Sequence, residues 1–297
     1  DYSVVSMPPP SSGGALLIQI LNMMEPFAVG AMGYGSADVM HLMVEAERRA
    51  YADRAEHLGD PDFYRVPLQQ LVDKGYARQR FKGFDPDRAG ISAGANAGAF
   101  AHESKETTHL SIMDRNGNAV ALTTTLNSGY GSHIVVEGAG FLLNNEMDDF
   151  SSKPNTLNQF NLIGREANAI EPRKRMLSSM TPTVVLRDGK PILVTGSPGG
   201  STIITTVLQV LVNVIDHGMT LSEAVSSPRF HHQWIPDSIT VEADSFSAGT
   251  LDALRKKGHL DIRPARYGLG DANSIMRVDG VLHGVEDPRT QGGAAGY

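Results

Sequence analysis

The chain has 297 residues, 33 acidic side chains against 26 basic ones for a formal charge of −7, and no cysteine. This length allows one large domain or two ordinary ones, and the lack of cysteine excludes a disulfide scaffold, thiolate metal sites and cysteine nucleophiles. The acidic balance argues against a nucleic-acid partner, because neutralising phosphates requires a basic domain.

The N-terminus and the apolar runs show no secretory signal and no membrane-spanning helix. The first residues lack the basic and apolar regions of a secretory signal, and there is no initiator Met, which indicates a processed or truncated start. The longest apolar runs, 15–21 and 203–215, are shorter than the ~18 to 20 residues that cross a bilayer.

The first third of the chain is predicted to be mostly helical. After the turn-rich segment 8–14, apolar residues from Leu16 to Met24 recur at helical spacing. Ser36 is a suitable N-cap for a second helix that ends near His57. The Gly- and Ala-rich segment 83–106 predicts a flexible linker that ends at a domain boundary.

Beyond this boundary the pattern changes to that of β-hairpins. Three pairs of short apolar segments are each joined by a turn, the first of which contains Asn-Gly. The pairs are 108–113 with 119–126, 184–186 with 192–194, and 274–278 with 281–284. Between the last two pairs, residues 201–216 are apolar on most sides and predict a buried helix. Hairpins covered by helices indicate a layered α+β fold.

Two polar segments are candidates for chemistry. The carboxylates of Glu146, Asp148 and Asp149 fit a metal or an ammonium group, and they equally fit a solvated acidic turn. The pair Ser178-Ser179 stands before a strand, where its hydroxyls face a ligand or complete an ordinary turn. No HExxH motif is present, which disfavours a zinc hydrolase.

The segment 195–201, Thr-Gly-Ser-Pro-Gly-Gly-Ser, follows a predicted strand and opens the buried helix. Backbone N–H groups at a helix N-terminus stabilise negative charge. The lysine of a phosphate-binding loop is absent. An oxyanion hole, a carboxylate-binding turn and a plain strand-to-helix turn therefore remain open.

These motifs form an ordered set. Segments 107–109, 142–150, 177–180 and 195–201 follow one another, with 6–14, 51–54 and 58–61 upstream and 228–234 downstream. In this combination the chain resembles gamma-glutamyltranspeptidases over nearly its whole length. The resemblance implies an N-terminal-nucleophile hydrolase with a four-layer αββα sandwich. Residues 1–106 then correspond to the C-terminal part of a large subunit, whose N-terminal part the chain lacks, and residues 107–297 to the small subunit.

The resemblance also implies the catalytic residues. The precursor would cut itself between Glu106 and Thr107, and Thr107 would be the nucleophile in both self-cleavage and catalysis. Cleavage frees an α-amino group of pKa about 7.7 to 8.0, which can act as the base for the threonine hydroxyl. Thr125 would orient this hydroxyl, and the N–H groups of Gly199 and Gly200 would form the oxyanion hole.

The substrate residues follow from the same resemblance. A glutamyl group carries an α-ammonium and an α-carboxylate, which need acceptors and donors respectively. Asn127, Glu146 and Asp149 would hold the ammonium, and Ser178 and Ser179 the carboxylate. No metal or organic cofactor is implied.

Two features depart from the family. An arginine that pairs with the α-carboxylate lies in the part of the large subunit that these 297 residues do not contain. Several bacterial members have a lid tyrosine where this chain has Phe160. We hypothesise that losing this hydroxyl eases access for bulky acceptors or water.

The implied function is transfer of a γ-glutamyl group from glutathione or another γ-glutamyl compound to water, an amino acid or a peptide, by a heterodimer of self-cleaved subunits. Family members are usually periplasmic, secreted or surface-bound. One alternative is a cephalosporin acylase, which cleaves a glutaryl group that lacks the ammonium. The other is an inactive truncated or uncleaved fragment.

Overall fold

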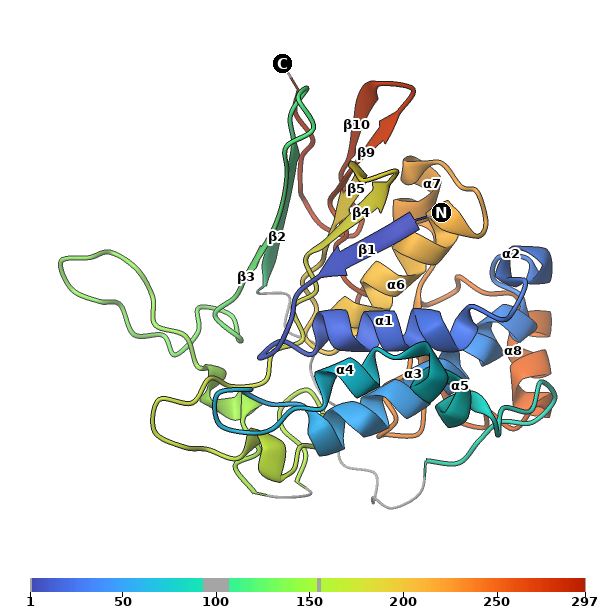
Figure 1. Ribbon diagram of the computed structural model, residues 1–297, viewed down its shortest axis with the longest axis horizontal. Coiled ribbons are helices and arrows are strands. Elements are labelled where there is room, and N and C mark those ends of the chain that lie inside the picture. The colour runs from blue at the N-terminus through green and yellow to red at the C-terminus, as the bar shows by residue number, and fades with distance from the viewer. Residues whose placement is uncertain (1, 93–106, 154–155, 297) are drawn as a thin grey trace.

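The computed structural model describes residues 2–92, 107–153 and 156–296. Its centre is a five-stranded antiparallel sheet of order β1-β4-β5-β9-β10 (Figure 1). The strands are β1 (Tyr2–Ser6), β4 (Thr183–Arg187), β5 (Lys190–Thr195), β9 (Ser274–Val278) and β10 (Val281–Val285). Both hairpins in this sheet close through Asp-Gly turns with positive φ at both residues, which matches the twist of the paired strands.

Helices cover one face of this sheet (Figure 1). The longest of the described helices are α1 (Gly13–Met24), α3 (Ala37–His57) and α6 (Thr202–Ile215). Leu16, Leu42 and Ile204 from these helices join Val185 and Leu193 of the sheet in one buried apolar cluster. Burying apolar surface between the layers is the main driving force for this arrangement.

The hairpin of β2 (Thr108–Met113) and β3 (Ala119–Thr124) packs on the other face of the sheet, against β4, β5 and β9. His109 and Met113 are buried beneath it. The opposite side of the hairpin leaves four apolar side chains about half exposed, at 47% to 51%. They are Leu110, Ile112, Val120 and Leu122. The described chain thus forms three layers, of helices, sheet and hairpin.

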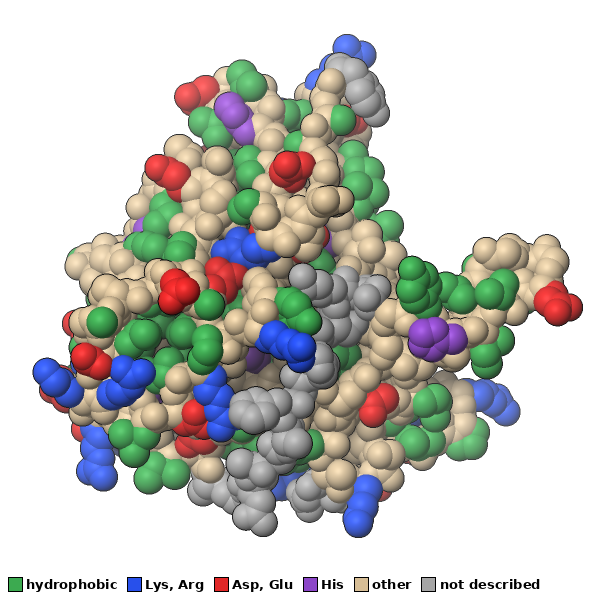
Figure 2. All heavy atoms as spheres, turned by 180° about the vertical axis from the view of Figure 1, so that it is seen from behind, with side chains coloured by type: hydrophobic (Ala, Val, Ile, Leu, Met, Phe, Trp, Pro, Cys, Tyr) green, Lys and Arg blue, Asp and Glu red, His purple; other side chains and the backbone are tan. Residues whose placement is uncertain are grey.

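An arm formed by residues 130–142 projects from the body of the molecule next to this hairpin (Figures 1 and 2). Its exposed apolar side chains are Tyr130, Ile134, Val135 and Phe141. Among the described residues, no helix is long and apolar enough to span a membrane.

The principal sequence predictions of structure are confirmed. The helices expected at 16–24, 36–57 and 201–216 are α1, α3 and α6, and the three expected hairpins form. Ser36 caps α3 by accepting a hydrogen bond from the backbone N–H of Val39 at 3.2 Å. The strand expected to reach Leu126 ends at Thr124, because the chain turns at Asn127, which has a φ of 75°.

Several short elements were not predicted, because each is too brief to show a period. They are β1, α2 (Val29–Met32), α4 (Leu68–Leu71), α5 (Lys74–Phe81), α7 (Leu221–Ser226), α8 (Ala248–Lys256), the 3₁₀ helices Glu146–Asp149 and Glu166–Asn168, and a small sheet of β6 (Phe230–His231), β7 (Ile239–Val241) and β8 (Ile262–Pro264). Three of these helices nevertheless carry a local signal: Asp73 and Ser247 are the N-caps of α5 and α8, and Thr220 and Glu223 form a capping box at α7.

Most of the predicted linker, residues 93–106, lies outside the described residues. The preceding residues run along α3 and α8. Ala89 donates its N–H to the Lys257 carbonyl at 2.6 Å, and Gly90 donates to the Glu45 carboxylate at 2.9 Å. The first part of the predicted linker is therefore attached to α3 and to the end of α8, contrary to the expectation of a flexible segment.

Candidate active site

Thr107 lies directly before β2 and is buried, with 7% of its surface exposed. Pairing of Thr108 with Thr124 places Thr125 opposite it, and the Thr107 hydroxyl donates to Thr125 Oγ1 at 2.9 Å. Thr125 Oγ1 also accepts the Asn127 N–H at 2.9 Å. The hydroxyl predicted to be the nucleophile is therefore oriented by a partner that is itself held by the backbone.

The predicted oxyanion loop connects β5 to α6. Gly199 and Gly200 have φ values of +131° and +56°, which L side chains rarely adopt. Within the described ranges of the chain, neither of their N–H groups donates a hydrogen bond. They precede a helix of 14 residues, whose N-terminus adds partial positive charge. This arrangement fits the stabilisation of an oxyanion.

Phe160 packs directly on this loop. A Cβ atom placed on Gly200 would lie 2.8 Å from Cδ1 of the Phe160 ring, and Phe160 is only 6% exposed. The adjacent Gln159 donates its N–H to Asp148 Oδ2 at 3.0 Å. This segment therefore connects the acidic turn to the oxyanion loop.

The acidic residues predicted to hold an ammonium lie on the 3₁₀ helix Glu146–Asp149. Asn127 adjoins this helix, because its Nδ2 donates to the Asn145 carbonyl at 3.2 Å. Burial raises the pKa of Glu146, and it raises the pKa of Asp149 to about 7 against the opposing effect of Arg54. A bound cation would favour the ionised form of both carboxylates.

Each serine hydroxyl predicted to hold a carboxylate accepts a hydrogen bond from the protein. Ser178 Oγ accepts the Met180 N–H at 3.0 Å, and Ser179 Oγ accepts from Arg54 Nη2 at 3.2 Å. A hydroxyl that accepts such a bond keeps its proton to donate. The pair can therefore present two O–H donors to a carboxylate.

Arg54 contacts the predicted site through Ser179, whereas sequence reasoning named it only as part of a motif. It is 5% exposed on α3, and besides Ser179 it donates to Ser12 Oγ at 3.0 Å. Ser12 in turn donates its N–H and hydroxyl to the Ser178 carbonyl at 2.8 and 2.7 Å. The sequence did contain a signal for this role, because a charged arginine on the buried face of a helix is rare unless it is paired.

The motif at 58–61 is structural. Asp60 is fully buried and accepts three hydrogen bonds from Arg175, which hold the pKa of its carboxyl well below the usual range.

Of the predicted site residues, only Glu106 lies outside the described part of the chain. Of the others, Thr107, Thr125 and Asn127 are linked to the acidic turn, and this turn is linked to Gly200 through Phe160. Ser178 and Ser179 are linked to Arg54 and Ser12.

One group of described residues, His41, Glu45 and His259, has the spacing of metal ligands. The two histidines already form a hydrogen bond of 2.8 Å, and Glu45 pairs with Arg49 at 2.6 Å and Arg48 at 3.2 Å. Two guanidinium groups beside the carboxylate oppose a cation. The arrangement therefore assigns no metal to this group.

Comparison with known proteins shows the family to which the chain belongs. The family model described as Gamma-glutamyltranspeptidase matches residues 1–297. The chain belongs to the gamma-glutamyltranspeptidase family. The glutathione hydrolase proenzyme of Escherichia coli (strain K12) is 53% identical over 291 residues, which are 97% of this chain and 50% of that protein. The chain thus spans about half the length of the curated gamma-glutamyltranspeptidase relatives it matches.

Solved structures are also similar. The gamma-glutamyltranspeptidase from Pseudomonas nitroreducens complexed with L-DON has a TM-score of 0.61 and 47% identity, covering 64% of this chain and 99% of that one. The cephalosporin acylase from Bacillus halodurans has a TM-score of 0.80 and 26% identity, covering 100% of this chain and 51% of that one. The predicted family and its mixed α/β fold are confirmed.

Proposed function

We propose that the protein carrying this chain is a gamma-glutamyltransferase and glutathione hydrolase. The observation that carries the proposal is the Thr107 hydroxyl, buried at the start of β2 and donating to Thr125 at 2.9 Å. A threonine at the head of a strand becomes an N-terminal nucleophile once the preceding peptide bond is cut. The family membership and the named relatives support this role.

The proposed cut lies between Glu106 and Thr107. The Pseudomonas nitroreducens chain corresponds to 64% of this chain over 99% of its own length, and residues 107–297 are 191 of 297 residues, the same share. After the cut, the α-amine of Thr107 would take the hydroxyl proton as Oγ1 attacks the γ-carbonyl carbon. The N–H groups of Gly199 and Gly200 would stabilise the oxyanion, and the amine would return the proton to the leaving group.

The resulting γ-glutamyl ester would be resolved by water or by the amine of an amino acid or peptide. In this proposal, Asn127, Glu146 and Asp149 hold the α-ammonium of the donor, and the two serine hydroxyls hold its α-carboxylate. A carboxylate pair of this kind favours a γ-glutamyl donor over a glutaryl one, because a glutaryl group would leave the buried Glu146 and the partly buried Asp149 without a cation.

We further propose a four-layer αββα sandwich completed by a segment outside this chain. The half-exposed apolar face of the β2–β3 hairpin supports this proposal, because such a face is usually covered. The same segment would supply the arginine for the α-carboxylate.

The first test is an intact mass of the purified chain, followed by hydrolysis of γ-glutamyl-p-nitroanilide and glutaryl-p-nitroanilide. Two fragments of 106 and 191 residues and a preference for the γ-glutamyl anilide are expected. A preference for the glutaryl anilide would indicate an acylase. A single uncut chain without activity would indicate a precursor or an inactive fragment.

Asp149→Asn is expected to raise KM for γ-glutamyl-p-nitroanilide by about 10- to 100-fold, since a hydrogen bond to a charged group contributes ~1.5–3 kcal/mol. In the unmodified protein the Asp149 carboxyl has a pKa of about 7, so it loses its charge as the pH falls through 7. As the pH falls below 7, log kcat/KM should therefore decrease by close to 2 per pH unit, because the Thr107 amine also gains a proton. The variant should show a slope of 1.

Asp148→Asn is the matched control. Its carboxylate accepts the Gln159 N–H, which an amide oxygen can also accept. KM and the slope should remain those of the unmodified protein. A slope of 2 retained in Asp149→Asn would contradict the assignment of Asp149 to the ammonium.

Phe160→Tyr is expected to reduce hydrolysis and transfer to bulky peptides relative to transfer to small amino acids. One added hydrogen bond of ~1 kcal/mol predicts a change of about fivefold in the hydrolysis-to-transfer ratio. Product analysis with glycine and with a longer peptide as acceptors measures it. Phe141→Tyr adds the same hydroxyl on the exposed arm and should change nothing. An unchanged ratio in Phe160→Tyr would rule out the role of the missing hydroxyl.

A further inference from the structure

The segment 268–274, here called the bracing loop, packs against the oxyanion loop. Gly270 has a φ of +72°, and a Cβ atom on it would lie 2.6 Å from Ser197 Oγ and 2.5 Å from Thr206 Oγ1. A Cβ atom on Gly199 would lie 3.5 Å from the Gly270 Cα. The two backbones therefore approach so closely that a side chain at Gly270 would displace its neighbours.

A hydrogen bond joins the same two loops. Asp271 donates its N–H to Ser197 Oγ at 2.8 Å, and this hydroxyl donates to the Pro198 carbonyl at 2.6 Å. Ser197 is fully buried. The bracing loop thus holds the two residues that directly precede Gly199.

The other end of the bracing loop contacts the strand that follows Thr107. Ser111 donates its hydroxyl to the Asn273 carbonyl at 2.9 Å, and it lies 3.0 Å from His109 Nε2. Burial lowers the pKa of His109 to about 4, so its ring is neutral at neutral pH. Since the Ser111 proton goes to Asn273, Nε2 of His109 is the donor in the second contact. One loop therefore contacts both the oxyanion loop and the strand that directly follows Thr107.

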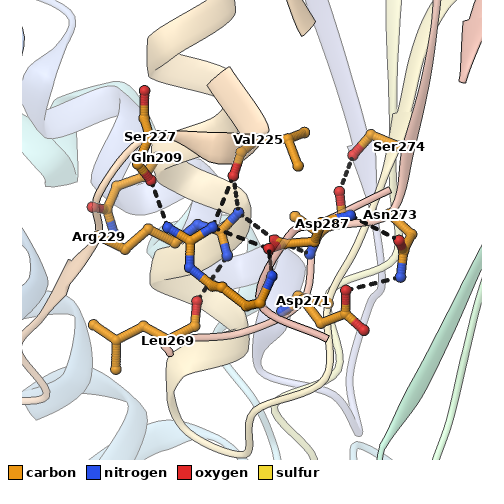
Figure 3. A network of polar contacts seen from close by, with 12 residues as sticks. Gln209, Val225, Ser227, Arg229, Leu269, Asp271, Asn273, Ser274 and Asp287 are labelled. Atoms are coloured by element: carbon orange, nitrogen blue, oxygen red, sulfur yellow. Dashed lines mark hydrogen bonds and ion pairs between the residues drawn. The ribbon is translucent and has the colours of Figure 1, made fainter. Parts of the chain in front are cut away.

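Buried charges hold the bracing loop in place (Figure 3). Arg229 donates to the Leu269 carbonyl at 2.8 Å and pairs with Asp287 at 2.6 Å, and both side chains are at most 1% exposed. Asp287 Oδ2 also accepts the Ala272 N–H at 2.7 Å. These bonds fix the main chain on both sides of Gly270 and Asp271.

A second ion pair completes the network. Arg289 pairs with both Glu242 and Asp287, and Glu242 Oε1 accepts the Leu269 N–H at 2.9 Å. The charges of two positive and two negative side chains thus balance one another in this network. Truncating one partner of such a buried pair would leave an uncompensated charge, so milder substitutions are needed to test what the loop does.

We propose that the bracing loop is a positioning element that sets the N–H groups of Gly199 and Gly200 relative to the Thr107 hydroxyl. This inference rests on the proposed function. The loop touches no predicted substrate-binding residue in the contacts described above. Its displacement should therefore lower the rate of the chemical steps while leaving the binding of the glutamyl group intact.

Ser197→Ala removes the hydroxyl that accepts the Asp271 N–H, and Gly270→Ala inserts a methyl group between the loops. In the full-length gene product, each is expected to lower kcat for γ-glutamyl-p-nitroanilide by about 10- to 100-fold, as small misplacements in active sites do. The inhibition constant of L-norvaline, which keeps the α-ammonium and α-carboxylate of glutamate but has a methyl group in place of the γ-carboxylate, should change by less than about twofold.

Two controls match these variants. Ser247→Ala removes a hydroxyl that accepts one backbone N–H at the start of α8, and Gly280→Ala adds a methyl group at a φ of +84° with no atom within 4 Å. Both should lower the midpoint of thermal unfolding slightly and leave kcat unchanged.

Unchanged kcat in both loop variants of an active protein would overturn the positioning role alone. Equal losses of kcat and of norvaline affinity would also overturn it, because they would indicate general damage to the site. An unmodified full-length protein without γ-glutamyl hydrolysis would overturn the proposed function, and the positioning role with it.

Discussion

Thr107→Ala is expected to leave the protein as one uncut chain and to lower γ-glutamyl hydrolysis by about 10⁴-fold or more, the loss typical of removing a nucleophile. The physical reason is that the hydroxyl hydrogen-bonded to Thr125 at 2.9 Å is proposed to attack twice, first the Glu106–Thr107 bond and then the substrate. Intact mass separates the two effects, because only a cut chain can expose the α-amine that serves as the base.

Thr107→Ser keeps the hydroxyl and should still be cut, at a reduced rate. Thr108→Ala changes the next residue, whose side chain is exposed on the outer side of β2, and should be cut as the unmodified chain is. Fragments of 106 and 191 residues from Thr107→Ala would show that another group performs the cleavage and would refute the assignment.

The sequence predicted those parts of the fold that local interactions determine. The turns Asp188-Gly189 and Asp279-Gly280 adopt positive φ where their composition requires it, and Ser36 caps α3. Strand β1 could not be predicted, because its stability comes from pairing with β4, where Tyr2 lies opposite Arg187. Local pattern contains no information about a partner 185 positions away.

The candidate site shows the same division between features that the sequence predicts and features that only the folded chain determines. Resemblance named Ser178 and Ser179, but the orientation of their hydroxyls depends on Met180 and on Arg54 from a distant helix. The bracing loop was not predicted at all, because Asp271 and Ser197 are joined only by folding. Residue types and order identify what a site contains, whereas its geometry comes from contacts between segments far apart in the chain.

Gly200→Ala is expected to lower kcat by about 10²- to 10³-fold, the loss typical of removing one oxyanion donor. Its Cβ atom would lie 2.8 Å and 2.9 Å from two atoms of the Phe160 ring, at a φ of +56°. Either the ring or the backbone must move, and the buried ring has little room. The N–H group would then no longer point to the oxyanion position.

Phe160→Ala tests whether this contact is the cause. Combined with Gly200→Ala, it should restore part of the lost kcat, because residues in contact show non-additive effects. Gly189→Ala is the matched control: its φ is +71°, but a Cβ atom there meets nothing within 4 Å. That variant should lose about 1 kcal/mol of unfolding free energy from backbone strain alone and retain its kcat. Additive losses in the double variant would mean that backbone strain, and not the Phe160 ring, displaces the oxyanion donor.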